Sequence, residues 1–253
     1  MNDRTAWLKS RIEKPIEPEL VICDPHHHLW DYPDSRYLVD EFLEDTGSGH
    51  RVTLTVFVEC LNSYRTHGPE ALRPVGETEY VEHIAATSDA AAGSTRVAAG
   101  IIGFADLSLG AAVRPVLEAQ LEASGRFRGI RHVSAWDPSK QIHDAHTNPP
   151  ERLLGQHKFR DGFACLNDLG LTFDAWLYHP QLPELTDLAR AFPDTTIVLD
   201  HIGGPIGIGP YASKREEIFG SWCHDIAELA QCENVVVKLG GLTMSVAGFR
   251  WHK

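Results

Sequence analysis

Three consecutive histidines stand where a predicted β-strand ends, in the segment Asp24-Pro-His-His-His28. Alternate residues of a strand point to the same side, so His26 and His28 can converge on one point. Two imidazoles placed in this way suit a divalent cation such as Zn²⁺, or they can hold the anionic group of a substrate. His27 points to the opposite side, where we expect it to pack in the interior or to support the other two.

Two further histidines follow later strands of the sequence. His179 stands in the segment Trp176–Gln181, and His201 stands in Val198–Gly204. Each is a weak signal alone, because a single histidine after a strand is more often a hydrogen-bonded structural group. In a barrel of parallel strands, however, the carboxyl ends of all strands meet at one mouth. Histidines after three separate strands therefore predict one shared site.

The elements that must position these histidines are short β-branched runs that alternate with segments of helical periodicity. Apolar stripes at helical spacing cover residues 113–121, 182–192 and 218–229, whereas residues 29–51 and 134–158 are irregular and predict long loops. The alternation is typical of a parallel α/β sheet, and the chain has the length of about 250 residues that one (β/α)8 barrel needs. The predicted strands are Leu20–Asp24, Val52–Val58, Thr95–Ile102, Phe127–Val133, Leu171–Leu177, Thr195–Leu199 and Asn234–Leu239.

The composition narrows the class of partner. The chain has 253 residues, of which 23 are basic and 35 acidic, and its net charge of −12 disfavours nucleic acids and anionic membrane surfaces. Its start lacks the apolar core of a signal peptide, and no apolar run is long enough to cross a membrane. The five cysteines contain no C-x-x-C pair and are typical of reduced thiols, so we expect a cytoplasmic protein. The sequence leaves open whether the chain forms a homo-oligomer.

The motifs of the chain resemble those of the amidohydrolase superfamily, and within it the amidohydrolase-2 branch of lactonases and related decarboxylases. The resemblance implies an α/β fold, a distorted TIM (β/α)8 barrel. It also implies that His26, His28 and His179 bind a metal and that His201, together with His179, takes part in catalysis. The motifs that carry the resemblance are Asp24–His28, Gly129–Arg131, His179-Pro180, Asp200–Pro205 and Val237–Leu242.

Two departures from the family pattern refine this prediction. The fourth strand ends in Arg131-His132 without the bridging lysine of binuclear members, which favours one divalent ion, expected to be Zn²⁺, or none. The family's eighth strand ends in an aspartate that binds metal or acts as the base, and only seven strands are predicted before Lys253. We therefore expect a single domain over residues 1–253 that lacks the last βα unit and has impaired hydrolytic activity.

Four more side chains are expected to contact substrate at the barrel mouth. Glu59 ends the second strand, Arg131 the fourth and Lys238 the seventh, while Tyr64 is an aromatic residue suited to the pocket wall. The planar guanidinium of Arg131 matches the geometry of a substrate carboxylate. For Arg131 and Lys238 the alternative is a structural ion pair with Glu59 or Asp24. The sequence does not decide between the two.

These observations predict a hydrolase that opens a lactone or a similar carboxyl-derived bond by attack of water. Its partner is then a small lactone or carboxylate. The alternative enzyme is a metal-dependent non-oxidative decarboxylase, and the alternative outside catalysis is an impaired barrel fragment that only binds ligand. The sequence contains neither a P-loop nor a Gly-x-Ser-x-Gly nucleophile elbow, which argues against nucleotide hydrolysis and serine-hydrolase chemistry.

Overall fold

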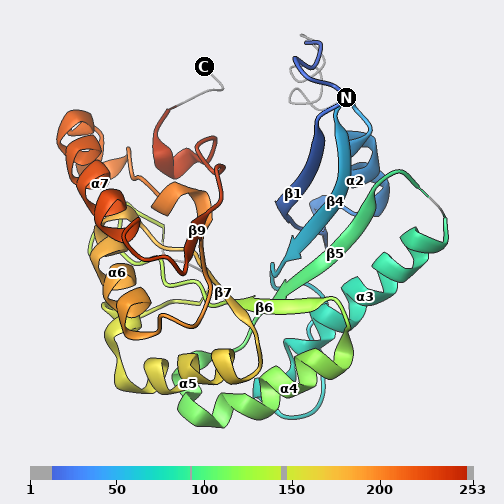
Figure 1. The fold of residues 1–253 in the computed structure, drawn as a ribbon, viewed down its shortest axis with the longest axis horizontal. Coiled ribbons are helices and arrows are strands. Elements are labelled where there is room, and N and C mark those ends of the chain that lie inside the picture. Colours follow the sequence, from blue (N-terminus) through green and yellow to red (C-terminus); the bar gives the residue numbers. More distant parts are fainter. Residues whose placement is uncertain (1–12, 92, 144–146, 250–253) are drawn as a thin grey trace.

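Seven parallel strands form one curved sheet in the computed structural model of the chain, which describes residues 13–91, 93–143 and 147–249. The order of the strands in space follows their order in the sequence. The sheet curls into a partly closed barrel, whose first and last strands face each other across an open side (Figure 1). The strands are β1 (Val21–His27), β4 (Arg51–Val58), β5 (Arg96–Gly103), β6 (Phe127–Arg131), β7 (Thr172–Ala175), β8 (Ile197–Leu199) and β9 (Val235–Val237).

The sequence-based prediction of a distorted α/β barrel with seven strands is confirmed. Each predicted run overlaps one strand of the sheet, because strands covered on both faces read as nearly continuous apolar runs. Helices cover the convex, outer side of the sheet (Figure 1). They are α3 (Val75–Ala90), α4 (Arg114–Ala123), α5 (His157–Asp168), α6 (Leu182–Ala191) and α7 (Arg215–Leu229).

Aromatic packing between α5 and the sheet fixes the central strands. Phe159 and Phe163 of α5 and Phe173 of β7 are all fully buried. The Phe163 and Phe173 rings meet edge to face, with centroids 5.2 Å apart. Burial of each such side chain contributes about 1.5–3 kcal/mol. The strands that carry the later site residues are thus anchored by the main core.

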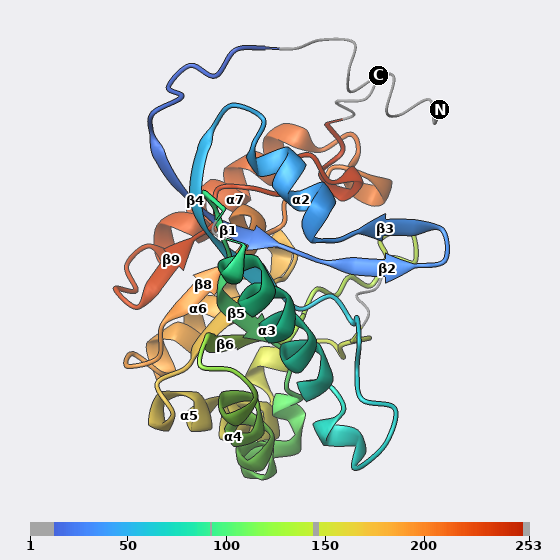
Figure 2. The ribbon, with the colours of Figure 1, turned by 90° about the vertical axis from the view of Figure 1, so that its right-hand side faces the viewer.

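The segment 29–51 is more ordered than predicted. It forms a hairpin of β2 (Trp30–Tyr32) and β3 (Ser35–Tyr37), which projects from the body of the molecule (Figure 2), followed by α2 (Val39–Thr46). The expectation of an irregular loop was wrong because three-residue strands are too short to show a period. The Pro33-Asp34 dipeptide between them is a turn signal that could have revealed the hairpin.

Short 3₁₀ turns begin or end most of the loops. The described part of residues 134–158 is irregular up to η3, as expected. No helix in the described ranges is both long enough and apolar enough to cross a bilayer. The turns are η1 (Glu70–Leu72), η2 (Leu107–Val113), η3 (Leu153–Gly155), η4 (His179–Gln181), η5 (Asp200–Gly203), η6 (Gly209–Tyr211) and η7 (Ser245–Ala247).

Candidate active site

His26 lies at the centre of a polar cluster at the carboxyl ends of the strands. Its Nε2 atom is 3.2 Å from Nε2 of His28, and its Nδ1 atom is 3.4 Å from Oδ1 of Asp200. The centroids of the His26 and His201 rings are 4.6 Å apart. The structure therefore brings together three of the four histidines that the sequence singled out.

The ring of His28 is fixed by the neighbouring strand. Its Nδ1 donates to the backbone carbonyl of Val58, at 2.7 Å, which leaves the lone pair on Nε2 facing His26. Burial lowers the pKa of His28 to about 2, and the charge of Arg131 lowers it further in the same direction. The imidazole is therefore neutral at physiological pH, which is the form that binds a metal or accepts a proton.

His27 takes the opposite orientation, as expected from the alternation along β1. Its ring stacks on Phe42 of α2, with centroids 4.1 Å apart, and its Nε2 is 3.0 Å from the hydroxyl of Thr55. Burial lowers the pKa of His27 to about 3. This residue packs β1 against α2 and does not face the cluster.

Arg131 and Glu59 form a buried ion pair next to the histidines. The Arg131 Nε donates to Oε1 of Glu59 at 2.8 Å, and Nη2 donates to the Glu59 backbone carbonyl at 2.5 Å. Nη1 points toward Nε2 of His26, at 3.4 Å. The ion-pair alternative is thus the arrangement observed, and one donor of Arg131 still faces the site. Burial raises the pKa of the Tyr64 hydroxyl, and the negative charges of Glu77 and Glu59 raise it further.

Lys238, which follows β9, extends into the same cluster. Its ammonium donates to Asp174 of β7 and is 3.2 Å from Oδ1 of Asp200. Burial and the charge of Asp200 raise the pKa of Asp174 to about 6. The ion-pair alternative for Lys238 is also observed, but its partners are Asp174 and Asp200 instead of Glu59 or Asp24. Sequence reasoning missed Asp174, whose signal is a lone carboxylate inside an apolar strand.

The backbone around His201 is held in an uncommon conformation. His201 and Ile202 have φ values of 53° and 56°, a left-handed region that non-glycine residues seldom adopt. Gly241 presses directly on His201, since a Cβ atom on this glycine would lie 2.4 Å from the His201 Cβ. Burial lowers the pKa of His201 to about 4. The neutral ring also contacts Trp176, at a centroid distance of 4.8 Å.

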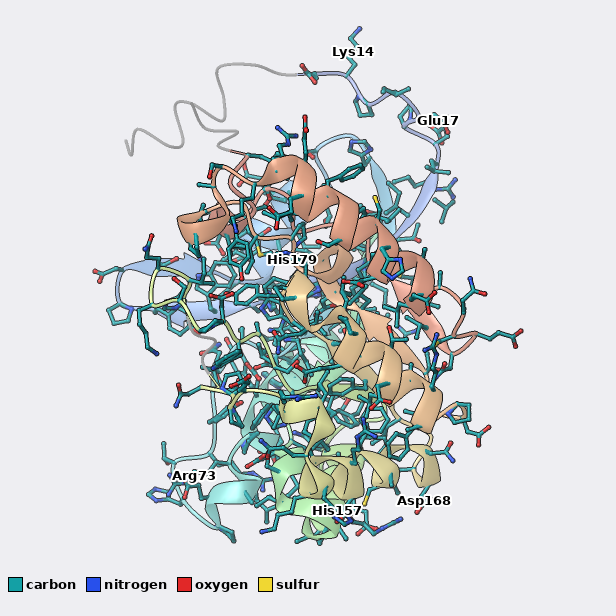
Figure 3. All side chains as sticks on the ribbon, turned by 90° about the vertical axis from the view of Figure 1, so that its left-hand side faces the viewer. Lys14, Glu17, Arg73, His157, Asp168 and His179 are labelled. Carbon is teal, nitrogen blue, oxygen red and sulfur yellow. The ribbon has the colours of Figure 1, made fainter. Side chains whose placement is uncertain are left out.

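His179 lies next to the start of α6 (Figure 3). Its Nδ1 accepts a hydrogen bond from the backbone amide of Ile206, at 3.3 Å, and its ring meets that of Tyr211. Burial lowers its pKa to about 4. The structure does not bring His179 to His26 or His28, and the lone pair of Nδ1 is engaged by Ile206. A metal-binding or catalytic role for His179 has no support in these contacts and stays a prediction.

The cluster offers the donor atoms that a divalent cation needs. Within the described residues, His26, Asp200 and His201 bring one potential ligand atom each to within 4.8 Å of one another. Both carboxylate oxygens of Asp200 are buried and make no hydrogen bond, and the cationic groups beside them are 3.2 Å or more away. Burial alone would raise the pKa of Asp200, but its interactions with His26 and the neighbouring cations lower it. An ionised, buried carboxylate beside neutral imidazoles fits a divalent cation.

A second buried carboxyl, Glu77, supports the loop that follows β4. Its Oε1 accepts hydrogen bonds from the backbone amides of Cys60 and Asn62, at 2.9 and 2.8 Å. These bonds fix the backbone immediately after Glu59. They therefore also help to position Glu59, the partner of Arg131. Burial and the charge of Glu59 raise the pKa of Glu77 to about 8, although the two amides oppose the shift.

The substitution Glu77→Gln is expected to remove a pH dependence of stability. Between the ordinary pKa of 4.5 and about 8, folded Glu77 keeps a proton that the unfolded chain releases. The free energy of unfolding of the natural chain therefore falls as the pH rises through this range, by an amount on the order of 4–5 kcal/mol. Urea unfolding at about pH 5 and about pH 9 measures the change. Glu118→Gln on the exposed side of α4 is the control and should leave the slope intact, whereas an unchanged slope in Glu77→Gln contradicts the assignment.

The fold and the cluster together define a class of protein. A parallel (β/α) barrel with histidines and carboxylates at the carboxyl ends of its strands is the architecture of a TIM-barrel enzyme. The family model for amidohydrolase, Amidohydro_2, matches residues 23–252. The chain belongs to this amidohydrolase family.

Two curated proteins are similar to the chain in sequence. An uncharacterized protein, y4mH, from Sinorhizobium fredii is 30% identical over 250 residues, which cover 89% of this chain and 74% of the relative. An L-fucono-1,5-lactonase from Burkholderia ambifaria is 31% identical over 191 residues, which cover 71% of this chain and 59% of the relative. The matched part thus spans about three fifths of the lactonase.

Solved structures share the fold at lower sequence identity. A Burkholderia multivorans amidohydrolase with bound zinc has a TM-score of 0.61 at 21% identity, over 88% of this chain and 70% of that protein. A probable 2-pyrone-4,6-dicarboxylic acid hydrolase from Acinetobacter baumannii, with citric acid bound, has a TM-score of 0.54 at 13% identity. The matched region covers 87% of this chain and 70% of the Acinetobacter protein.

Proposed function

We propose that the chain carries the active site of a hydrolase that opens an uncharged lactone by attack of water. The observation that supports this most is the convergence of His26, His28, Asp200 and His201 at one point on the carboxyl edge of the sheet. The lactonase relative supports the same reaction class. The impaired fragment and the decarboxylase remain the competing outcomes of the tests below.

The residues of the cluster divide the work of such a reaction. His201 is neutral and half-buried, so it is suited to accept the proton of the attacking water. Arg131 Nη1 faces the cluster and can donate to the lactone carbonyl oxygen as negative charge develops there. We propose zinc as the cation held by His26, His28 and Asp200, where it would lower the pKa of a bound water.

The pairing of the two cations in the site favours a substrate without a carboxylate. Two cations, Arg131 and Lys238, stand among three carboxylates, those of Glu59, Asp174 and Asp200. Each cation already contacts a carboxylate of the protein, so neither is available as a full partner for a substrate anion. A substrate carboxylate buried here would therefore lose its hydration without gaining a cationic side chain of its own, which is costly. The same argument disfavours a dicarboxylate and the acid substrate of a decarboxylase.

A panel of lactones tests this proposal. The purified chain, loaded with Zn²⁺, is given uncharged aldonolactones and lactones that carry a carboxylate, and acid release is followed in a pH-stat. We expect kcat/KM to be at least about tenfold higher for the uncharged lactones, because Arg131 and Lys238 are already paired with carboxylates of the protein. The variant with His26 and His28 both replaced by alanine serves as the blank. Release of CO₂, or a preference for carboxylated lactones, would overturn the proposal.

A further inference from the structure

Lys238 places its ammonium group inside the donor set of the candidate cation site. Its Nζ is 3.2 Å from Oδ1 of Asp200 and 3.4 Å from Nδ1 of His26. Those two acceptor atoms are themselves 3.4 Å apart, so the three atoms form a nearly equilateral triangle. The lysine thus contacts two of the residues that a divalent cation would use, and it does so from the position directly after the last strand of the sheet.

Asp174 offers Lys238 a second carboxylate. It lies on β7, it is 1% exposed, and it accepts a hydrogen bond from the same ammonium. The flexible four-carbon chain of a lysine allows its ammonium to move between two nearby acceptors. Arg131 does not have this freedom, because its guanidinium is bound to both the side chain and the backbone of Glu59.

We propose that Lys238 is a built-in competitor for the divalent cation and that Asp174 is the acceptor that holds Lys238 when the cation binds. With the site free of metal, the ammonium neutralises Asp200, whose oxygens are buried and make no hydrogen bond. A divalent cation on Asp200 and His26 repels the ammonium, which then keeps Asp174 alone. Metal affinity is therefore set by a lysine and an aspartate that are not themselves ligands.

Zinc binding to the whole 253-residue chain tests this competition without any assay of activity. Isothermal titration with Zn²⁺ gives the affinity, and elemental analysis gives the stoichiometry. We expect Lys238→Met to bind Zn²⁺ about 10- to 100-fold more tightly, the range that residues next to a metal site commonly control. Lys238→Gln, which also lacks the charge, should show the same direction and replaces the first variant if that one unfolds.

Asp174→Asn should change the affinity in the opposite direction. In this variant Lys238 has only Asp200 left as a carboxylate partner. We therefore expect the affinity for Zn²⁺ to fall by about 10-fold or more. Removing any negative charge would also weaken binding, and the double variant separates the two causes. We compare the change in the logarithm of zinc affinity that Asp174→Asn causes in two backgrounds. In the Lys238→Met background this change should be less than half of the change in the natural chain. An equal effect in both backgrounds would show that Asp174 acts only as a charge.

The matched control is Lys158→Met on the exposed side of α5, which removes one positive charge far from β9 and should leave zinc affinity within about twofold. Zinc affinity of Lys238→Met and Lys238→Gln equal to that of the natural chain would overturn the inference. A natural chain that binds no zinc while Lys238→Met does would support it. The inference rests on the cation site of the proposed function, but failure to hydrolyse any lactone leaves these binding results unaffected.

Discussion

Replacing both His26 and His28 with alanine is expected to lower kcat/KM for the preferred lactone by about 10³-fold or more. These two rings carry the nitrogens that face each other at 3.2 Å, and Asp200 and Val58 orient them. Without them the carboxylate of Asp200 loses its contact with His26, and the site loses two of the nitrogens proposed to hold the cation. The steady-state rate and the zinc content of the purified variant measure the two consequences.

Two matched variants show whether that loss is specific to the cluster. His224→Ala removes an exposed histidine of α7 and should leave kcat/KM unchanged. His27→Phe, from the same histidine triplet, keeps a ring that can stack on Phe42 and should retain activity within about threefold. A double variant of His26 and His28 that still turns over lactone within tenfold of the natural chain would exclude them from the catalytic machinery.

Arg131→Met is expected to destabilise the fold by about 3–5 kcal/mol, because it leaves the carboxylate of Glu59 buried beside an uncharged side chain. The guanidinium also joins β6 to the end of β4 through the Glu59 carbonyl, so the loss includes a hydrogen bond between neighbouring elements. Urea unfolding at neutral pH measures the change. Adding Glu59→Gln to Arg131→Met removes the buried charge that has lost the Arg131 guanidinium, and we expect it to recover more than half of the lost stability.

An exposed ion pair provides the comparison for this prediction. Arg114→Met breaks the pair with Asp168 on the surface, where both side chains are well exposed, and should cost less than about 1 kcal/mol. A loss in Arg131→Met no larger than that in Arg114→Met would mean that the buried pair does not hold the barrel mouth together. Equal stability of the single and double variants would mean that the charge of Glu59 is compensated from elsewhere.

Much of the fold was predictable, because covered parallel strands have a distinctive pattern. The apolar runs of 52–58 and 95–102 correspond to strands within one residue at each end. The hairpin at Trp30–Tyr37 escaped prediction because its strands are three residues long and their pairing depends on a Pro-Asp turn. Period-based reasoning needs longer runs than this.

The candidate site was predictable only in part. The spacing of His26 and His28 fixed their common direction, and the ends of parallel strands placed His201 nearby. Asp200 directly follows β8, and the left-handed backbone at His201 and Ile202 lets Asp200 and His201 both lie beside His26. Asp174 stands within an apolar strand, and its partner Lys238 is 64 residues further along the chain. Contact between residues so far apart in sequence depends on the parallel pairing of β7 with β8 and of β8 with β9. No local sequence pattern predicts that pairing.

The curved sheet has two edge strands, and its polar cluster spans the space between them. Among the described residues no backbone ladder joins β1 to β9, but His26 of β1 and Lys238 after β9 approach within 3.4 Å although they are 212 positions apart. Side-chain contacts thus connect β1 to β9 across the open side of the sheet, whereas backbone hydrogen bonds connect the other neighbouring strands. A cation bound in the site should therefore slow amide hydrogen exchange in β1 and in β9 to the same extent. The first and last strands would then open and close as one cooperative unit.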